Sequence, residues 1–511
     1  MKRITAILVL ISLFAFEVKA QNNFKLTTAQ EAAIQKLRAK VEANPSNLEA
    51  HEAFIDAFKM NDHPQLEAQY KTWTSKYPKN YVVPFAIGQY YVNHENPKAT
   101  PFLLQASILK PDKAEIWYLL ASATRLNNDL TKRREYLIKA MQLDPKNADY
   151  ATDYAESFDK TDKLRHDSLA LEVVRKFPEN ECAIKSLFLL AINSSVPAEK
   201  VAYFKQLYNH KANPLSEWYL GGTLAYVDFL LKTNADQAFD VALTMAIEGK
   251  RNRNIWKDRI IVADAFLKAR KALAENDPKT ALALLNQVDL DNPMSGSYGI
   301  DAKEYLVLFK AEAADAAKQT NMAFDSLAVL YSKEPTEGLH DAVFKYGSKL
   351  DMDSNSVVKS IWKIRDSRAV KATNFSLENF QSGGKTALSD YQGKLVLLTY
   401  WFPGCGPCRA EFPHFESVLK KFSKNDIAYL GLNLEPSQDQ AVPAFLKETG
   451  YTFMALHDNP GRDKGNLAAP GAPSNYLIDQ KGRIVFSGFR IDAENEKMLE
   501  RMIKETLAVK D

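Results

Sequence analysis

Apolar residues recur with helical spacing over residues 21–366, and between residues 45 and 178 prolines return every 33 or 34 positions. These prolines are Pro45, Pro78, Pro111, Pro145 and Pro178, and each precedes a new helical apolar pattern. A proline has no amide hydrogen to continue a helix, and Asn or Asp beside it can cap the next one. Beyond residue 178 the period degrades, yet residues 220–231, 260–273 and 302–330 keep the helical spacing. We therefore predict stacked helix pairs over residues 21–366.

After Asp366-Ser367-Arg368 the pattern changes to short β-type runs and Gly-rich turns. Residues 395–400 form a continuous apolar run, which is typical of a strand buried on both faces of a sheet. The other predicted elements are a strand at 427–432, helices at 408–422, 444–449 and 494–507, and a β-hairpin of 475–478 with 483–487. This alternation predicts an α/β domain at residues 373–511, joined to the helices by a linker at 367–372.

The helical unit ending at Pro145 resembles a tetratricopeptide repeat. Its residues at the signature positions of that family are Trp117, Leu120, Ala121, Leu137, Ala140 and Pro145. Thr124 and Arg133 depart from the usual pattern, and the other units match mainly in length and proline. The resemblance implies an all-α solenoid whose concave surface binds a protein partner. A passive scaffold is the alternative, because the array shows no ligand motif.

The first 20 residues read as a secretory signal peptide. Lys2 and Arg3 precede the apolar run 4–16, and Val18-Lys19-Ala20 is a small-residue cleavage site. An uncleaved anchor is the rival interpretation, but a bilayer span needs about 20 apolar residues and this run has 13. We expect an exported protein that is soluble after cleavage, periplasmic if the leader is bacterial.

Charge and cysteine content narrow the function classes. The chain has 66 Lys and Arg against 63 Asp and Glu, so its formal charge is only +3. The sequence also has no stripe of basic residues of the kind that binds nucleic acid, so we expect no nucleic-acid partner. Three cysteines do not make a disulfide-stapled scaffold. Cys182 lies in a helical segment, where we interpret it as a buried core thiol.

The other two cysteines form the motif Cys405-Gly406-Pro407-Cys408, directly after the apolar run and at the start of a helix. A zinc site needs about four ligands, and the chain has no second cysteine pair, so we expect neither metal nor cofactor. The helix dipole and free amides favour a thiolate at Cys405. We predict that Cys405 is the nucleophile and Cys408 the resolving thiol. Gly406 and Pro407 add no charge, which favours a reducing potential near −270 mV, about that of thioredoxin.

The surroundings of this motif resemble the exported TlpA/ResA-like thiol-disulfide oxidoreductases of the thioredoxin superfamily, from about residue 372 to 511. Besides the motif itself, the resemblance rests on Gly393, Lys394, Leu395, Val396, Leu397, Leu398, Trp401, Arg409, Glu411, Phe412 and Pro413, and on Gly471-Ala472-Pro473-Ser474.

The resemblance implies a thioredoxin-like fold and a Cys405–Cys408 disulfide. It implies that the Ala472–Pro473 bond is cis and that Ala472, Pro473 and Trp401 line the substrate site. Glu411 would relay a proton during exchange. The alternative for Glu411 is an exposed helix-start residue favoured by the dipole.

At two positions the residue differs from the pattern of the family that this domain resembles. Thr399 stands where thioredoxins carry a buried Asp, which shifts the role of proton acceptor to Glu411. Gly404 replaces an aromatic residue before the first cysteine, so substrate preference does not transfer from relatives.

Together these patterns predict a periplasmic disulfide reductase or isomerase that acts on protein substrates chosen with help of the helical repeats. The resemblance implies a membrane thiol transporter as electron donor. The alternative is a repeat-based scaffold protein with a regulatory dithiol. A peroxidase is disfavoured because no separate peroxidatic cysteine is evident.

Overall fold

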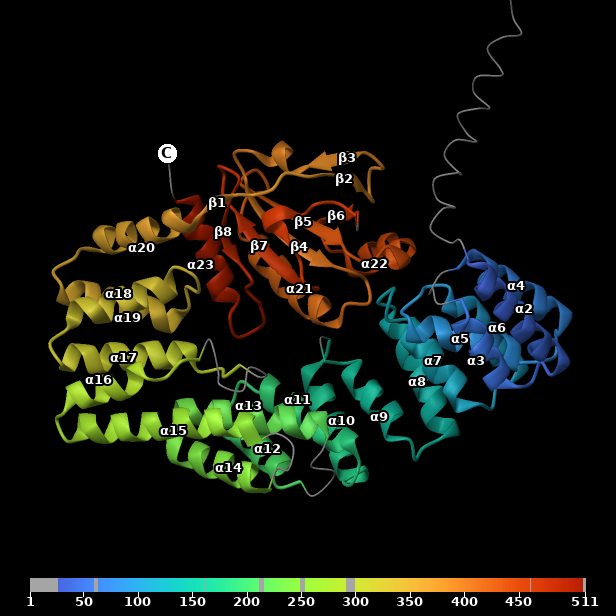
Figure 1. Cartoon of the computed structure of the whole chain (residues 1–511), viewed down its shortest axis with the longest axis horizontal. Helices are drawn as coiled ribbons and strands as arrows, with labels where there is room; N and C mark the ends of the chain where they lie inside the picture. Colours follow the sequence, from blue (N-terminus) through green and yellow to red (C-terminus); the bar gives the residue numbers. More distant parts are fainter. Residues whose placement is uncertain are drawn as a thin grey trace, which may run out of the picture. The chain divides into compact units, whose positions relative to one another are not determined.

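The computed structural model describes residues 26–58, 63–159, 161–210, 216–248, 253–290, 299–459 and 461–508. It confirms the predicted fold class, since a long run of helices is followed by an α/β sheet domain (Figure 1). The predicted signal peptide at residues 1–20 lies outside the described residues. Within the described ranges, no helix has the length and apolar character that crossing a membrane requires.

The helical part comprises α2 to α20. Their bounds are α2 Thr28–Ala43, α3 Leu48–Asp56, α4 Pro64–Lys76, α5 Val82–Asn93, α6 Ala99–Leu109, α7 Ala114–Ala123, α8 Leu130–Leu143, α9 Ala148–Glu156, α10 Lys163–Lys176, α11 Glu181–Asn193, α12 Pro197–Tyr208, α13 Glu217–Thr233, α14 Ala235–Glu248, α15 Arg253–Ala274, α16 Pro278–Asn286, α17 Lys303–Ala316, α18 Thr320–Tyr331, α19 Glu337–Lys349 and α20 Ser354–Arg368.

The five periodic prolines stand immediately after helix ends. The C-cap residues that precede them are Asn44, Tyr77, Lys110, Asp144 and Phe177. In three of these turns an Asn two residues after the proline caps the next helix: Asn47, Asn147 and Asn180. Each of these Asn side chains accepts a hydrogen bond from a first-turn amide, which satisfies a donor that the helix itself cannot pair. The proline rhythm thus marks helix boundaries as predicted.

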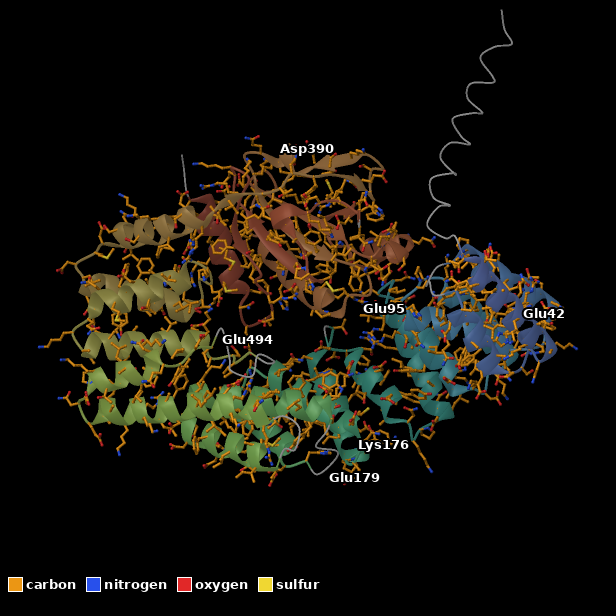
Figure 2. The ribbon with its side chains drawn as sticks, viewed as in Figure 1. Glu42, Glu95, Lys176, Glu179, Asp390 and Glu494 are labelled. Carbon is orange, nitrogen blue, oxygen red and sulfur yellow. A yellow bond between two sulfur atoms is a disulfide. The ribbon has the colours of Figure 1, made fainter. Side chains whose placement is uncertain are left out.

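Contacts divide the chain into two units. The first holds the residues up to Thr161 together with Glu435–Gly450. Its core is rich in aromatic side chains, and Phe54 and Tyr70 pack around the fully buried Trp73. The Trp73 indole donates to the Glu42 carboxylate at 3.2 Å, which ties α4 to α2. Glu42 is labelled among the side chains of this unit in Figure 2.

The second unit contains Asp162–Leu434 and Tyr451–Asp511, and with them the eight-stranded sheet. The strands are β1 Val370–Lys371, β2 Ser376–Asn379, β3 Lys385–Ala387, β4 Leu395–Trp401, β5 Ile427–Asn433, β6 Met454–His457, β7 Ser474–Ile478 and β8 Arg483–Ser487. Their order is β1-β8-β7-β4-β5-β6-β2-β3, and only the β4–β5 and β5–β6 pairs are parallel.

The remaining elements lie between and after these strands. They are the 3-10 turns η2 Leu388–Tyr391, η3 Pro436–Ala441 and η4 Gly465–Leu467, and the helices α21 Gly406–Leu419, α22 Val442–Thr449 and α23 Glu496–Leu507. Helices α21 and α23 contact each other, and α23 contacts β4. The opposite sheet face carries a second apolar cluster that includes Val396, Leu398 and Tyr400.

The long apolar elements of this domain were predicted and the short ones were not. Strands β4, β5, β7 and β8 and helices α21 to α23 stand where the sequence predicts them, within two or three residues at each end. Strands β1, β2, β3 and β6 have only two to four residues each and gave no separate signal. Residues 367–372 hold the end of α20 and all of β1.

The last helices and the sheet domain are packed together inside the second unit. The guanidinium of Arg365 on α20 is buried and donates to the Glu505 carboxylate on α23 and, at 3.0 Å, to the Ser332 carbonyl. The Tyr331 hydroxyl also donates to Glu505. An exposed ion pair, Lys497 with Glu337, bridges α23 and α19 at 3.1 Å.

Candidate redox site

Strand β4 delivers the cysteine motif from the centre of the sheet. All seven of its residues are buried, because β5 and β7 flank it and layers cover both faces. Cys405 follows as the N-cap of α21, and Pro407 occupies the first turn, where a missing amide costs nothing. The sulfur of Cys405 accepts a hydrogen bond from the Cys408 amide at 3.2 Å. The sequence context therefore produces the expected strand-to-helix turn.

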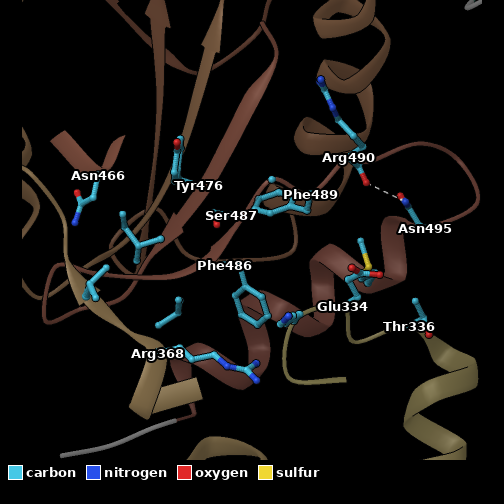
Figure 3. A pocket seen from close by; sticks show the side chains of 16 residues that line it. Glu334, Thr336, Arg368, Asn466, Tyr476, Phe486, Ser487, Phe489, Arg490 and Asn495 are labelled. Carbon is cyan, nitrogen blue, oxygen red and sulfur yellow. Dashed lines mark hydrogen bonds between the residues drawn. The ribbon is translucent and has the colours of Figure 1, made fainter. Parts of the chain in front are cut away.

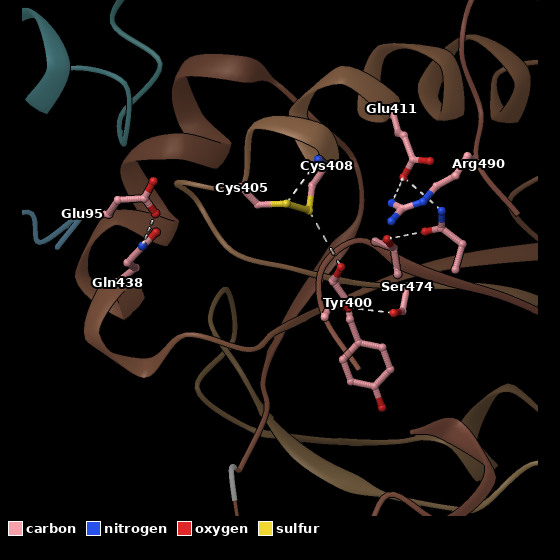
Figure 4. The surroundings of a disulfide bond; sticks show 11 residues. Glu95, Tyr400, Cys405, Cys408, Glu411, Gln438, Ser474 and Arg490 are labelled. Atoms are coloured by element: carbon pink, nitrogen blue, oxygen red, sulfur yellow. Dashed lines mark hydrogen bonds and ion pairs between the residues drawn. A yellow bond between two sulfur atoms is a disulfide. The ribbon is translucent and has the colours of Figure 1, made fainter. Parts of the chain in front are cut away.

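Cys405 and Cys408 are joined by a disulfide, with their Cα atoms 5.4 Å apart (Figure 4). Cys405 is 3% exposed and Cys408 is fully buried. This difference favours attack at Cys405, since an incoming sulfur reaches only the outer cysteine. On reduction, the amide of Cys408 and the positive end of α21 stabilise a thiolate at Cys405.

The Ala472–Pro473 peptide bond is cis, and it lies just before β7. Ser474, the next residue, pairs with Tyr400 on β4, so this loop stands beside the strand end that leads to the cysteines. The Tyr400 hydroxyl donates to the Leu467 carbonyl at 2.8 Å and fixes the preceding loop. Burial raises the pKa of Tyr400 to about 12, so this donor stays protonated at neutral pH.

Glu411 lies one turn beyond Cys408 on α21 and is 5% exposed. Its carboxylate accepts hydrogen bonds from the Asn475 side-chain amide and from the Ile491 backbone amide, both at 3.0 Å. The Arg490 guanidinium lies 3.7 Å away (Figure 4). Burial raises the pKa of Glu411 above its ordinary value, against the opposing effect of these three partners.

Asn475 connects this carboxyl group to the position where thioredoxins carry an Asp. Its side-chain oxygen accepts from the Thr399 hydroxyl at 2.6 Å, and its amide donates to Glu411 and to the Phe489 carbonyl. The side chain is 1% exposed, so it joins three segments in a dry interior. Sequence reasoning placed Asn475 in a strand but gave it no role. A polar residue at the start of a predicted hairpin strand was the available signal.

Trp401, predicted in the substrate site, is fully buried. Its ring packs edge-on against Phe412 and Phe453, with centroids 5.5 and 4.9 Å apart. Its contact with substrate stays a prediction.

Cys182 is buried in α11. Across the described ranges, no group of three or more His, Cys, Asp or Glu side chains is arranged to hold a metal ion.

Known proteins resemble this chain at the level of sequence. Residues 369–487 match the model of the AhpC/TSA family. Thioredoxin-like protein YneN of Bacillus subtilis is 30% identical over 135 residues, which are 26% of this chain and 76% of that protein. Thiol-disulfide oxidoreductase ResA of Bacillus subtilis is 32% identical over 114 residues, which are 22% of this chain and 63% of ResA, just under two thirds of its length.

A solved structure gives a similar match. The thiol:disulfide interchange protein, thioredoxin family protein, from Chlorobium tepidum TLS aligns with 28% of this chain and 98% of its own, at 22% identity and a TM-score of 0.24.

Proposed function

Because the chain belongs to the thioredoxin-like family of thiol-disulfide oxidoreductases, we propose that it is an exported, periplasmic disulfide reductase for protein substrates. The observation that carries the proposal is the Cys405–Cys408 disulfide at the N-terminus of α21, with only Cys405 reachable from outside. The chemistry needs no bound cofactor or metal.

The reaction transfers two electrons from the reduced cysteine pair to a client disulfide. The Cys405 thiolate attacks one client sulfur, the client S–S bond breaks, and the other client sulfur leaves as a thiolate that takes up a proton. The Cys408 thiolate then attacks the Cys405 sulfur, which releases the second client thiol and forms the enzyme disulfide. A membrane thiol transporter, as electron donor, would return two electrons and two protons.

Glu411 is proposed as the base for the resolving step. Cys408 is buried and must lose its proton before it attacks, and residues three apart on a helix are neighbours, with Cβ atoms about 5–6 Å apart. Ionised Glu411, held by Asn475 and Arg490, is the acceptor on that helix face. Ala472 and cis Pro473 are proposed to pair with the client backbone, and Trp401 to support the site wall.

The Gly406-Pro407 pair supports a reducing direction, because neither residue stabilises the thiolate further. A measured potential above about −150 mV would show an oxidant instead.

The helical array, residues 21–366, is proposed to be tetratricopeptide-like and to bind a protein partner. The α/β domain is proposed at 373–511 and the signal peptide at 1–20. The competing function is a scaffold protein with a regulatory dithiol. Loss of both cysteines decides between the two, since an unchanged phenotype in cells would favour the scaffold.

Capture of a client tests the reductase directly. Cys408→Ser leaves the Cys405 nucleophile without a resolving thiol, so it accumulates a mixed disulfide that mass spectrometry identifies. Cys405→Ser is the matched control, because it keeps Cys408 but removes the accessible sulfur. Equal capture by both variants would contradict the assigned roles.

A further inference from the structure

A pocket of about 700 Å³ lies beside the second half of β8, within the second unit (Figure 3). This volume is in the range of specific ligand sites, about 300–1,000 Å³. The side chains that matter below are Val485, Ser487 and Arg490 on β8 and its following turn, Lys333 and Glu334 between α18 and α19, and Arg368 at the end of α20. The helical array and the sheet domain thus build the pocket together.

One wall of the pocket is an open strand edge. Strand β1 pairs with β8 only at Ile484 and Arg483, so no described strand pairs on that side from Val485 onward. The Gly488 amide donates to the Asn475 carbonyl at 3.0 Å, toward β7. Because backbone groups alternate sides along a strand, those of the exposed Ser487 point away from β7. This edge is a template for an added strand.

The charges around the pocket favour an acidic ligand. The lining holds three cationic residues, Lys333, Arg368 and Arg490, and a single carboxylate, Glu334. Arg490 also lies 3.7 Å from Glu411, so Lys333 and Arg368 carry the excess. Lys333 is exposed and makes no ion pair with any described residue. The excess of positive charge complements carboxylates on an incoming chain.

The pocket lies two strands away from β4, the strand that leads to the dithiol. Ser487 pairs with Tyr476, which pairs with Leu398 on β4, so the three residues form one row across the sheet. Two strand spacings separate β8 from β4 by about 10 Å. Arg490 reaches from the pocket to Glu411, 3.7 Å away.

We propose that the pocket binds an extended acidic segment of the client polypeptide as an added strand on β8, two strands away from β4, which leads to the dithiol. This inference rests on the proposed function and names the kind of client that it selects.

Two matched peptides test the proposal on the full-length chain. Both are short, alternate Thr and Val, and carry one cysteine in a mixed disulfide; one has a pair of glutamates and the other a pair of lysines. The measured quantity is the ratio of kcat/KM for reduction of the acidic peptide over the basic one. We expect the ratio to exceed one and to decline with added salt.

Two variants test whether the pocket causes the preference for the acidic peptide. Lys333→Glu reverses one charge and should lower the ratio about tenfold. Ser487→Pro removes the outward amide and should lower kcat/KM for both peptides, because proline cannot donate to an added strand. Lys359→Glu on the exposed face of α20, outside the pocket, is the matched charge control and should change neither value.

The outcomes separate the two proposals. If the ratio is the same in wild type and in Lys333→Glu, the proposed binding of acidic segments is wrong. Reduction of the peptides would still support the proposed reductase activity. Failure to reduce either peptide overturns the enzyme. In that case, fluorescence anisotropy with a labelled, cysteine-free acidic peptide still decides the pocket, since Lys333→Glu should weaken its binding about tenfold.

Discussion

The buried ion pair between α20 and α23 should contribute strongly to the stability of the junction between the helices and the sheet, and the cost of breaking it can be predicted. Arg365 has a side chain 1% exposed, and Glu505 has one 23% exposed. The guanidinium also donates to two carbonyl oxygens, of Ser332 at 3.0 Å and of Tyr331 at 3.4 Å. The guanidinium carbon lies over the Phe486 ring on β8, 4.9 Å from the ring centroid.

Replacing Arg365 with Met keeps most of the packing volume and removes every donor. Breaking a buried pair by deleting one partner costs about 3–5 kcal/mol, because the remaining charge loses its compensation. Glu505 keeps the Tyr331 hydroxyl and some solvent, so we expect the lower end, about 3 kcal/mol. Lys497→Met breaks the exposed pair with Glu337, whose side chains are 73% and 60% exposed, and should cost less than about 1 kcal/mol.

Hydrogen exchange followed by mass spectrometry measures the difference locally. Amide exchange in α20 and α23 requires these helices to open, and its rate follows the population of the open state. A loss of about 3 kcal/mol raises that population, and with it the exchange rate, about 100-fold, since each 1.4 kcal/mol is a factor of ten. Adding Glu505→Gln to Arg365→Met should restore part of the protection, because the uncompensated charge is gone. Equal exchange in Arg365→Met and Lys497→Met would refute the reasoning.

Three further predictions concern Glu411 and the packing of the sheet. Asn475→Ala removes a donor to the Glu411 carboxylate, so the pKa of Glu411 rises and the acid limb of the pH profile for client release moves to higher pH; an unmoved limb contradicts the proton role. Because the folded pKa of Glu411 is raised, its contribution to stability is present at low pH and is lost as pH rises through that pKa; Glu411→Gln should flatten this part of the curve of unfolding free energy against pH. Gly431→Ala places a Cβ 2.6 Å from the Phe453 ring and should cost about 1–3 kcal/mol in thermal unfolding, whereas Gly221→Ala, with nothing within 4 Å, should not destabilise.

The elements set by local rules could be predicted from the sequence. The periodic prolines located helix ends because the missing amide acts at its own position in the chain. The apolar run located β4 because a strand buried on both faces of a sheet is apolar throughout. The cysteine motif was recognisable for the same reason, since its environment is made by the strand before it and the helix after it.

Features that depend on distant segments could not be predicted. Asn475 draws its role from Thr399, Glu411 and Phe489, which approach it only in the fold. Arg365 and Glu505 are 140 positions apart, and either alone reads as an ordinary surface charge. Strand β2 has four residues with alternating burial, a pattern too short to separate from a loop.

The passage from α20 to the sheet leaves a single residue between the helix end at Arg368 and β1 at Val370. A client held by the adjoining helices would not meet the dithiol through the random search of a flexible tether, for which the effective concentration depends on linker length. It would meet the dithiol at a fixed offset instead. Selection would then depend on the distance between the client segment bound by the helices and the client's disulfide. Only clients in which this distance matches the fixed offset would be reduced efficiently.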